Sequence, residues 1–235
     1  MRNQQSIRNL TIVALAVMSI TVTVLAANRH TTPPLLEPGA DWSEKRFDST
    51  PTRYIELEEN GSKVLMAASV DSASALWLPL ETALSEKVEL SWRWKVTRGL
   101  SNRLEREKSG DDYAARVFVG FDADPFNKDS RSLCYVWASD EPVGAVYPSP
   151  YSPNVITIVL RNKKDGTGEW EAETRDIVED FHRAFGAPPR TLHAVAIMVD
   201  TDNTRSRATT WFSDFAFSPS GRPVTLSEDL SPPDR

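Results

Sequence analysis

The sequence has few cysteines and histidines, the residues on which disulfides and zinc centres depend. Its 235 residues include one cysteine and three histidines. A single thiol cannot form an internal disulfide, and three scattered histidines argue against a three-ligand zinc centre. The sequence also lacks a nucleophile elbow, a phosphate-binding loop and a dinucleotide-binding fingerprint. Carboxylates are therefore the main side-chain groups left for catalysis or ligand binding.

Basic residues are too few and too scattered for a nucleic-acid-binding surface. The chain carries 27 lysines and arginines against 33 aspartates and glutamates, which gives a formal net charge of −6. Proteins hold the phosphate backbone through basic clusters, and no such cluster interrupts this acidic balance. We predict that nucleic acid is not a partner.

Long apolar runs are also missing, except at the amino terminus. There an uncharged segment from Leu10 to Ala27 follows Arg2 and Arg8 and is mostly Ile, Val, Leu and Ala. This pattern is typical of an export signal, here with cleavage after Ala26, but the segment is also close to the roughly 18 to 20 residues that span a bilayer. Residues 1–27 are thus predicted to be a signal peptide or an amino-terminal membrane anchor. Either one places the rest of the protein in the periplasm or outside the cell, with the membrane contacted only through this segment.

The remaining chain divides into a linker, one domain and a tail. Residues 28–41 contain three prolines and one glycine and indicate a linker. The folded domain is predicted over residues 42–218, and the proline-rich residues 219–235 are predicted to be a disordered tail. The lone Cys134 has apolar and aromatic neighbours in sequence, which favours a buried structural thiol over a reactive one.

Within the domain, short strands separated by turns are the dominant pattern. Residues 88–96 alternate strictly, with Trp92 and Trp94 beside Val and Leu on one face, which favours core packing over a sugar-stacking platform. Hairpins are predicted around Asn60-Gly61 and around residues 165–168. One helix is predicted from residue 176 to residue 185. Because strands and helices do not alternate, we predict a mainly β fold, an antiparallel β-sandwich of jelly-roll type with one short helix.

The most distinctive stretch is an acidic turn that leads directly into a strand. Asp111 and Asp112 precede an alternating run from residue 113 to residue 121, in which Arg116 is the only charged residue. A guanidinium on a covered sheet face must find a carboxylate or reach water. Two interpretations stay open, an ion pair that closes the end of the strand and one corner of a ligand site.

Other acidic residues also lie in turns at strand ends. Asp200 and Asp202 follow an apolar strand, and together with Asp111 and Asp112 they allow three interpretations. They could form a carboxylate pair for glycoside hydrolysis, bind Ca²⁺, or cap strands. Oxygen-bearing side chains also crowd a second loop, at Asp122, Asp124, Asn127 and Asp129. Their spacing does not follow the EF-hand pattern, which favours an ordinary solvated acidic loop over a Ca²⁺ site.

A series of sequence blocks runs through the domain in a fixed order. The blocks are Thr52-Arg53-Tyr54, Trp92-Arg93-Trp94-Lys95, Gly110-Asp111-Asp112-Tyr113-Ala114-Ala115-Arg116-Val117, Leu133-Cys134-Tyr135-Val136-Trp137, Arg175-Asp176-Ile177-Val178, Asp180-Phe181, Ala184-Phe185-Gly186, Met198 and Asp200-Thr201-Asp202-Asn203-Thr204. On these blocks the chain, from about Trp42 to Phe217, resembles the bacterial family of unknown function DUF3047. The family contributes no known catalytic residue, and it more usually has Tyr-Tyr-Gly-Asp where this chain has Trp211-Phe212-Ser213-Asp214. That final strand is also similar to the last strand of jelly-roll carbohydrate-binding modules.

The densest polar positions in these blocks are predicted to converge on one site, since Arg116 and Arg175 both need acidic partners. Arg93, on the polar face of its strand, is a further candidate. The candidate ligand-binding residues are Arg93, Asp111, Asp112, Arg116, Arg175, Asp176, Asp200, Asp202 and Asn203.

The function predicted from these features is non-catalytic binding of a polysaccharide or another cell-envelope component. The expected groove combines Arg93, Arg116, Tyr135 and Trp137. One alternative is a glycan hydrolase or lyase that pairs an acid of the 111–112 turn with an acid of the 200–202 turn. A purely structural envelope protein is another. No cofactor is expected, and Ca²⁺ is the one metal that the acidic turns make a candidate.

Overall fold

The computed structural model of the protein describes residues 42–47, 49–84, 87–122 and 130–219. The predicted export segment, the linker, Asp124, Asn127 and Asp129 lie outside these residues, as does the predicted tail beyond residue 219. Among the helices of the described residues, none combines the length and the apolar composition needed to cross a membrane.

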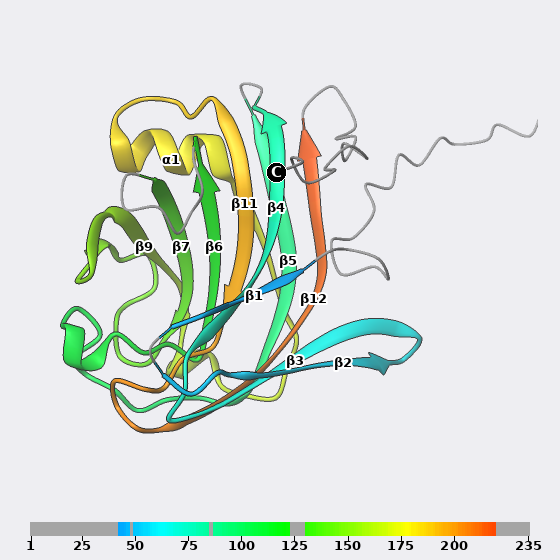
Figure 1. The fold of residues 1–235 in the computed structure, drawn as a ribbon, viewed down its shortest axis with the longest axis vertical. Coiled ribbons are helices and arrows are strands. Elements are labelled where there is room, and N and C mark those ends of the chain that lie inside the picture. Colours follow the sequence, from blue (N-terminus) through cyan, green and yellow to red (C-terminus); the bar gives the residue numbers. More distant parts are fainter. Residues whose placement is uncertain (1–41, 48, 85–86, 123–129, 220–235) are drawn as a thin grey trace, which may run out of the picture. The chain divides into compact units, whose positions relative to one another are not determined.

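The described residues form two sheets and one α-helix (Figure 1). The seven-stranded sheet has the order β1 (Ser43–Arg46), β4 (Ser74–Ala83), β11 (Thr191–Met198), β6 (Ala115–Phe121), β7 (Arg131–Ala138), β9 (Ser152–Asn162) and β8 (Val146–Ser149). The five-stranded sheet has the order β10 (Glu171–Asp176), β5 (Val88–Arg98), β12 (Arg207–Pro219), β3 (Ser62–Val70) and β2 (Arg53–Glu59). The predicted β-sandwich with one short helix is confirmed, although β7 and β9 pair in parallel rather than antiparallel.

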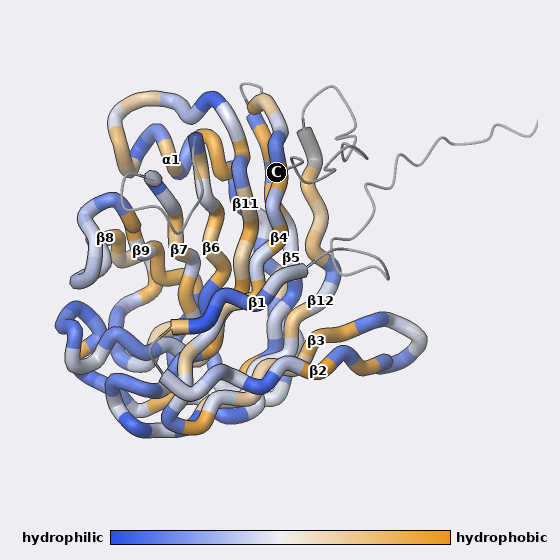
Figure 2. Tube along the Cα trace, viewed as in Figure 1, coloured by the Kyte–Doolittle hydropathy of each residue, from blue (hydrophilic) through white to orange (hydrophobic). Residues whose placement is uncertain are grey.

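The core lies between the two sheets and is built from the alternating faces of their strands. Trp92 and Trp94 of β5 are 1% and 0% exposed, so their prediction as core residues is confirmed. Across the sandwich the ring of Trp92 lies 5.5 Å from that of Tyr135, and the ring of Trp94 lies 5.8 Å from that of Trp137. Within the seven-stranded sheet, β6 and β7 are mostly hydrophobic, whereas the edge strand β1 is mostly hydrophilic (Figure 2). Burial of the facing apolar surfaces holds the layers together.

Helix α1 (Ile177–Phe185) has the ends that its sequence predicts. The carboxylate of Asp176 accepts hydrogen bonds from the backbone N–H groups of Val178 and Glu179, so this residue is the N-cap. Gly186 takes the left-handed conformation at the other end, with a φ of 78°. Ile177 and Phe181 are buried, and the ring of Phe181 lies 4.5 Å from that of Phe121 on β6.

One predicted hairpin is wrong. The strands on either side of residues 165–168 do not pair with each other, because β9 belongs to the seven-stranded sheet and β10 to the five-stranded sheet. The glycine-containing turn therefore carries the chain from one layer to the other at the same edge of the sandwich. The proline-containing segment that follows β7 also includes the short strand β8, which pairs with β9.

Candidate functional site

The acidic turn before β6 is held in place by a close backbone approach. A Cβ atom on Gly110 would lie only 2.5 Å from the carbonyl oxygen of Leu104, so no other residue fits here without rearrangement. Directly after it, Asp111 and Asp112 are 5% and 0% exposed. The acidic turn is thus buried, not solvated.

Arg116 finds the acidic partners that the sequence predicted for it. Its Nε donates to Oδ1 of Asp200 at 2.9 Å and its Nη2 donates to Oδ2 at 2.5 Å, while Oδ2 of Asp111 lies 3.4 Å from Nη2. All three residues are buried. Burial raises the pKa of Asp200 to about 7 although Arg116 acts in the opposite direction, and burial likewise raises the pKa of Asp111. The ion-pair interpretation of Arg116 is confirmed.

Asp112 organises the loop that follows β11. Its carboxylate accepts hydrogen bonds from the backbone N–H groups of Asn203 and Thr204, at 3.2 and 2.7 Å, and from the hydroxyl group of Thr204. One carboxylate oxygen each from Asp112, Asp200 and Asp202 lie within 4.8 Å of one another. The structure therefore brings together six of the nine candidate residues; they are Asp111, Asp112, Arg116, Asp200, Asp202 and Asn203.

The other three candidates lie elsewhere, so the prediction of one composite site is wrong for Arg175 and Asp176, and the further candidate Arg93 also lies apart. Arg175 forms a two-point ion pair with Asp180 of α1, at 2.8 and 2.6 Å, and Asp176 caps that helix. Arg93 pairs with Asp214 at 3.3 Å on the exposed side of the five-stranded sheet. These residues lie on β5 and β10 of the five-stranded sheet, or directly at its end, whereas β6 and β11 belong to the seven-stranded sheet. Local sequence does not show which sheet a strand joins.

The expected groove of Arg93, Arg116, Tyr135 and Trp137 is also wrong. Arg116, Tyr135 and Trp137 are between 0% and 4% exposed, so only Arg93 can meet a ligand from solution. The two aromatic rings fill the space between the sheets instead. Asp122, which the sequence placed in an acidic loop, accepts hydrogen bonds from the backbone N–H groups of Arg190 and Thr191 and so caps a strand end.

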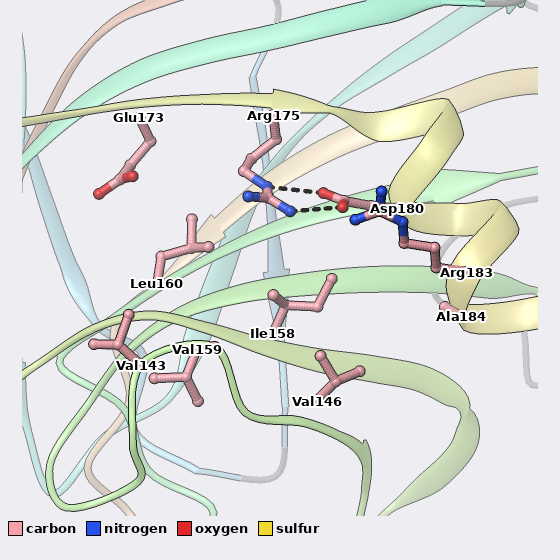
Figure 3. Close-up of a pocket in the computed structure, with 11 residues that line it drawn as sticks. Val143, Val146, Ile158, Val159, Leu160, Glu173, Arg175, Asp180, Arg183 and Ala184 are labelled. Atoms are coloured by element: carbon pink, nitrogen blue, oxygen red, sulfur yellow. Dashed lines mark hydrogen bonds and ion pairs between the residues drawn. The ribbon is translucent and has the colours of Figure 1, made fainter.

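A pocket of about 580 Å³ opens where β9, β10 and α1 meet (Figure 3). Figure 3 shows charged side chains along β10 and α1, and aliphatic side chains across from them on β9 and on the segment from Val143 to Val146. The lining residues are Val143, Gly144, Val146, Ile158, Val159, Leu160, Glu173, Arg175, Asp180, Arg183 and Ala184.

The charged side of the pocket is braced by hydrogen bonds to the core. The hydroxyl group of Tyr135 donates to Oδ2 of Asp180 at 2.8 Å, so both oxygens of this carboxylate are engaged by Tyr135 and Arg175. Oε1 of Glu173 accepts from Nε1 of Trp94 at 3.2 Å and from Nε of Arg161 at 2.7 Å. Burial raises the pKa of Glu173, and these two donors only partly oppose that effect.

The sequence pointed to Arg175 but not to the other residues of this pocket. A signal was present, because Glu171, Glu173 and Arg175 alternate along one strand and must therefore share a face. Their meeting with α1 and β9 depends on which sheet each strand joins.

Comparison with known proteins gives a family and distant structural likenesses. Residues 40–216 match the family described as "Protein of unknown function (DUF3047)". No curated protein matches the sequence.

Three solved structures illustrate the structural likenesses. The xyloglucanase domain of NopAA from Sinorhizobium fredii is 12% identical, with a TM-score of 0.43, over 75% of this chain and 92% of that one. A family 11 carbohydrate-binding module of Clostridium thermocellum is 6% identical, with a TM-score of 0.42, over 78% and 91%. Endoglucanase 3 of Trichoderma harzianum is 10% identical, with a TM-score of 0.40, over 77% and 99%. At these scores the likenesses do not identify a ligand for this chain.

Proposed function

The chain belongs to the DUF3047 family of proteins of unknown function, and from this premise we propose that its β-sandwich domain binds an uncharged segment of a polysaccharide or of another envelope glycan. The proposed site is the pocket between β9, β10 and α1. Binding there is proposed to be non-catalytic.

The observation that carries the proposal is the pairing of an aliphatic wall with a polar wall that has no net charge. Glu173 and Asp180 contribute two acids, and Arg175 and Arg183 contribute two bases. Sugar rings present C–H groups on their faces and hydroxyl groups at their edges. Guanidinium groups can donate to those hydroxyls and carboxylates can accept from them, while the aliphatic wall meets the ring faces. An uncharged glycan satisfies both walls without burying an unpaired charge.

One observation favours a second candidate, a glycan hydrolase. The raised pKa of Glu173 is a property of general acids in glycoside hydrolysis. Such a reaction also needs a second carboxylate that can attack the sugar or activate water. Both oxygens of Asp180, the other carboxylate of the pocket, already accept hydrogen bonds from Arg175 or Tyr135, which supports binding over turnover.

A glycan-array screen of the full-length protein, with product analysis on every glycan retained, tests the proposal. We expect retention of an uncharged glycan without release of shorter sugars. Sugar release that disappears in Glu173→Gln would replace the binding proposal with the hydrolase. Silence on every glycan would contradict both and favour a structural envelope role.

We propose in addition that the domain works outside the cytoplasm, either freed from residues 1–27 or tethered by them. The support is the uncharged segment from Leu10 to Ala27 behind two arginines. Mass spectrometry of the protein recovered from a periplasmic fraction should show a chain that starts after Ala26, or a full-length chain in the membrane fraction. Recovery of the full-length chain in the cytoplasm, free of membrane, would contradict export.

A further inference from the structure

A second site lies at the loop end of the seven-stranded sheet and uses different residues from the pocket. The carboxylates of Asp112, Asp200 and Asp202 gather there with Asp111 beside them, and among the described residues Arg116 is the cation paired with Asp111 and Asp200. One guanidinium against four carboxylates leaves a formal charge of −3 in a largely buried place. Buried charges of this kind are normally paired or coordinated to a metal.

Asp111 gives an independent sign that a ligand is expected here. Its carboxylate is almost fully buried, and Oδ1 has no hydrogen-bond partner in the part of the chain that the structure describes. Its Oδ2 lies beside Nη2 of Arg116, the same atom that binds Asp200, so the carboxylate is next to the cluster. The charges of Asp112 and Asp202 also contribute to the raised pKa of Asp111. A buried carboxylate oxygen without a donor is costly unless a cation completes it.

The hydrogen bonds already made by the other carboxylates leave room for a metal. A carboxylate has about four lone-pair sites. Asp200 uses one at Oδ2, for Arg116, and two at Oδ1, for Arg116 and the N–H group of Tyr113. Asp112 uses one at Oδ1 and two at Oδ2. Each residue thus keeps an acceptor site, and half-buried Asp202 gives access from solvent.

The ligand type and spacing select among cations. An all-carboxylate set suits hard cations such as Ca²⁺ and Mg²⁺. Two oxygens bound to one Ca²⁺ ion at about 2.3 to 2.6 Å can lie up to roughly 5 Å apart, whereas for Mg²⁺ the limit is roughly 4 Å. The oxygens of Asp112, Asp200 and Asp202 lie within 4.8 Å of one another, a range that Ca²⁺ spans in full. We infer that Asp112, Asp200 and Asp202 form a binding site for one calcium ion, with the buried carboxylate of Asp111 beside it.

Titration of the full-length protein, first stripped with a chelator, with calcium chloride tests this inference. Calorimetry should show one saturable site. The melting temperature should rise by about 5 to 10 °C when free Ca²⁺ exceeds the dissociation constant by about 100-fold. Magnesium chloride should bind more weakly. No heat and no shift in melting temperature up to about 10 mM calcium, which is above the range of weak extracellular modules, would overturn the inference.

Two matched variants assign the ion to these residues. Asp202→Asn removes one charge at the half-buried rim and should weaken Ca²⁺ binding by at least about tenfold, because charge count sets the affinity of such sites. Asp214→Asn removes an exposed carboxylate on β12, beside Arg93, and should leave binding unchanged. A calcium response that survives Asp202→Asn at full strength would place the ion elsewhere, for example at the acids among residues 124–129, and would overturn the assignment.

Discussion

Replacing Arg116 with methionine is expected to lower the free energy of unfolding by about 3 to 5 kcal/mol. The substitution keeps much of the side-chain volume but removes the cation that binds Asp200 and Asp111. Both carboxylates are buried, so water cannot replace the lost partner. Urea unfolding, followed by tryptophan fluorescence, measures the change.

Arg93→Met is the matched control, because it makes the same substitution in an exposed ion pair. The side chains of Arg93 and Asp214 are 45% and 49% exposed. Pairs of this kind contribute about 0 to 1 kcal/mol. If both variants lost the same amount of stability, the buried ion pair would not be the element that secures the acidic turn.

Replacing Trp94 with alanine is expected to cost about 3 to 5 kcal/mol, as for other large aromatic residues in cores. The side chain is 0% exposed, and its ring meets those of Trp92 and Trp137 edge-on, at 5.4 and 5.8 Å. Its Nε1 also donates to Glu173. The variant therefore loses core packing and the hydrogen bond to Glu173 in the pocket. Thermal or urea unfolding measures the combined loss of stability.

Trp211→Ala serves as the comparison, since Trp211 is a half-buried tryptophan on the outer face of the same sheet. It should cost clearly less, because less apolar surface leaves contact with the protein. A larger loss for Trp211 than for Trp94 would contradict the placement of the core between the two sheets.

The fold could be predicted in outline because local pattern carries it. The alternation in β5 fixes which face is buried, and Asp176 and Gly186 mark the two ends of α1. The partner of each strand is a different matter. The turn at residues 165–168 marks a change of direction, but whether the next strand pairs with its predecessor or joins the opposite sheet depends on long-range packing.

The candidate site could be predicted only in the part where two acidic turns lie at the neighbouring ends of paired strands. Pairing of Met198 with Arg116 places the loop after β11 beside the turn before β6, which unites the acids of the two segments. The need of Arg116 for an acid was visible in the sequence, but the choice of Asp200 was not. The pocket of Figure 3 was missed because its lining comes from β9, β10, α1 and the segment from Val143 to Val146 at the start of β8, and no single stretch carries its pattern.

The most direct test of the proposed function compares two valine-to-aspartate variants in their affinity for the glycan that the array identifies. Val143 lines the pocket and is 56% exposed, while Val70 lies at the end of β3, does not line it and is 53% exposed. Both substitutions add one negative charge at an exposed position, so the two variants differ only in whether that charge lies at the pocket. Isothermal titration calorimetry should show at least about tenfold weaker binding, or about 1.4 kcal/mol, for Val143→Asp and the unmodified affinity for Val70→Asp. Equal affinities in the two variants would contradict binding in this pocket.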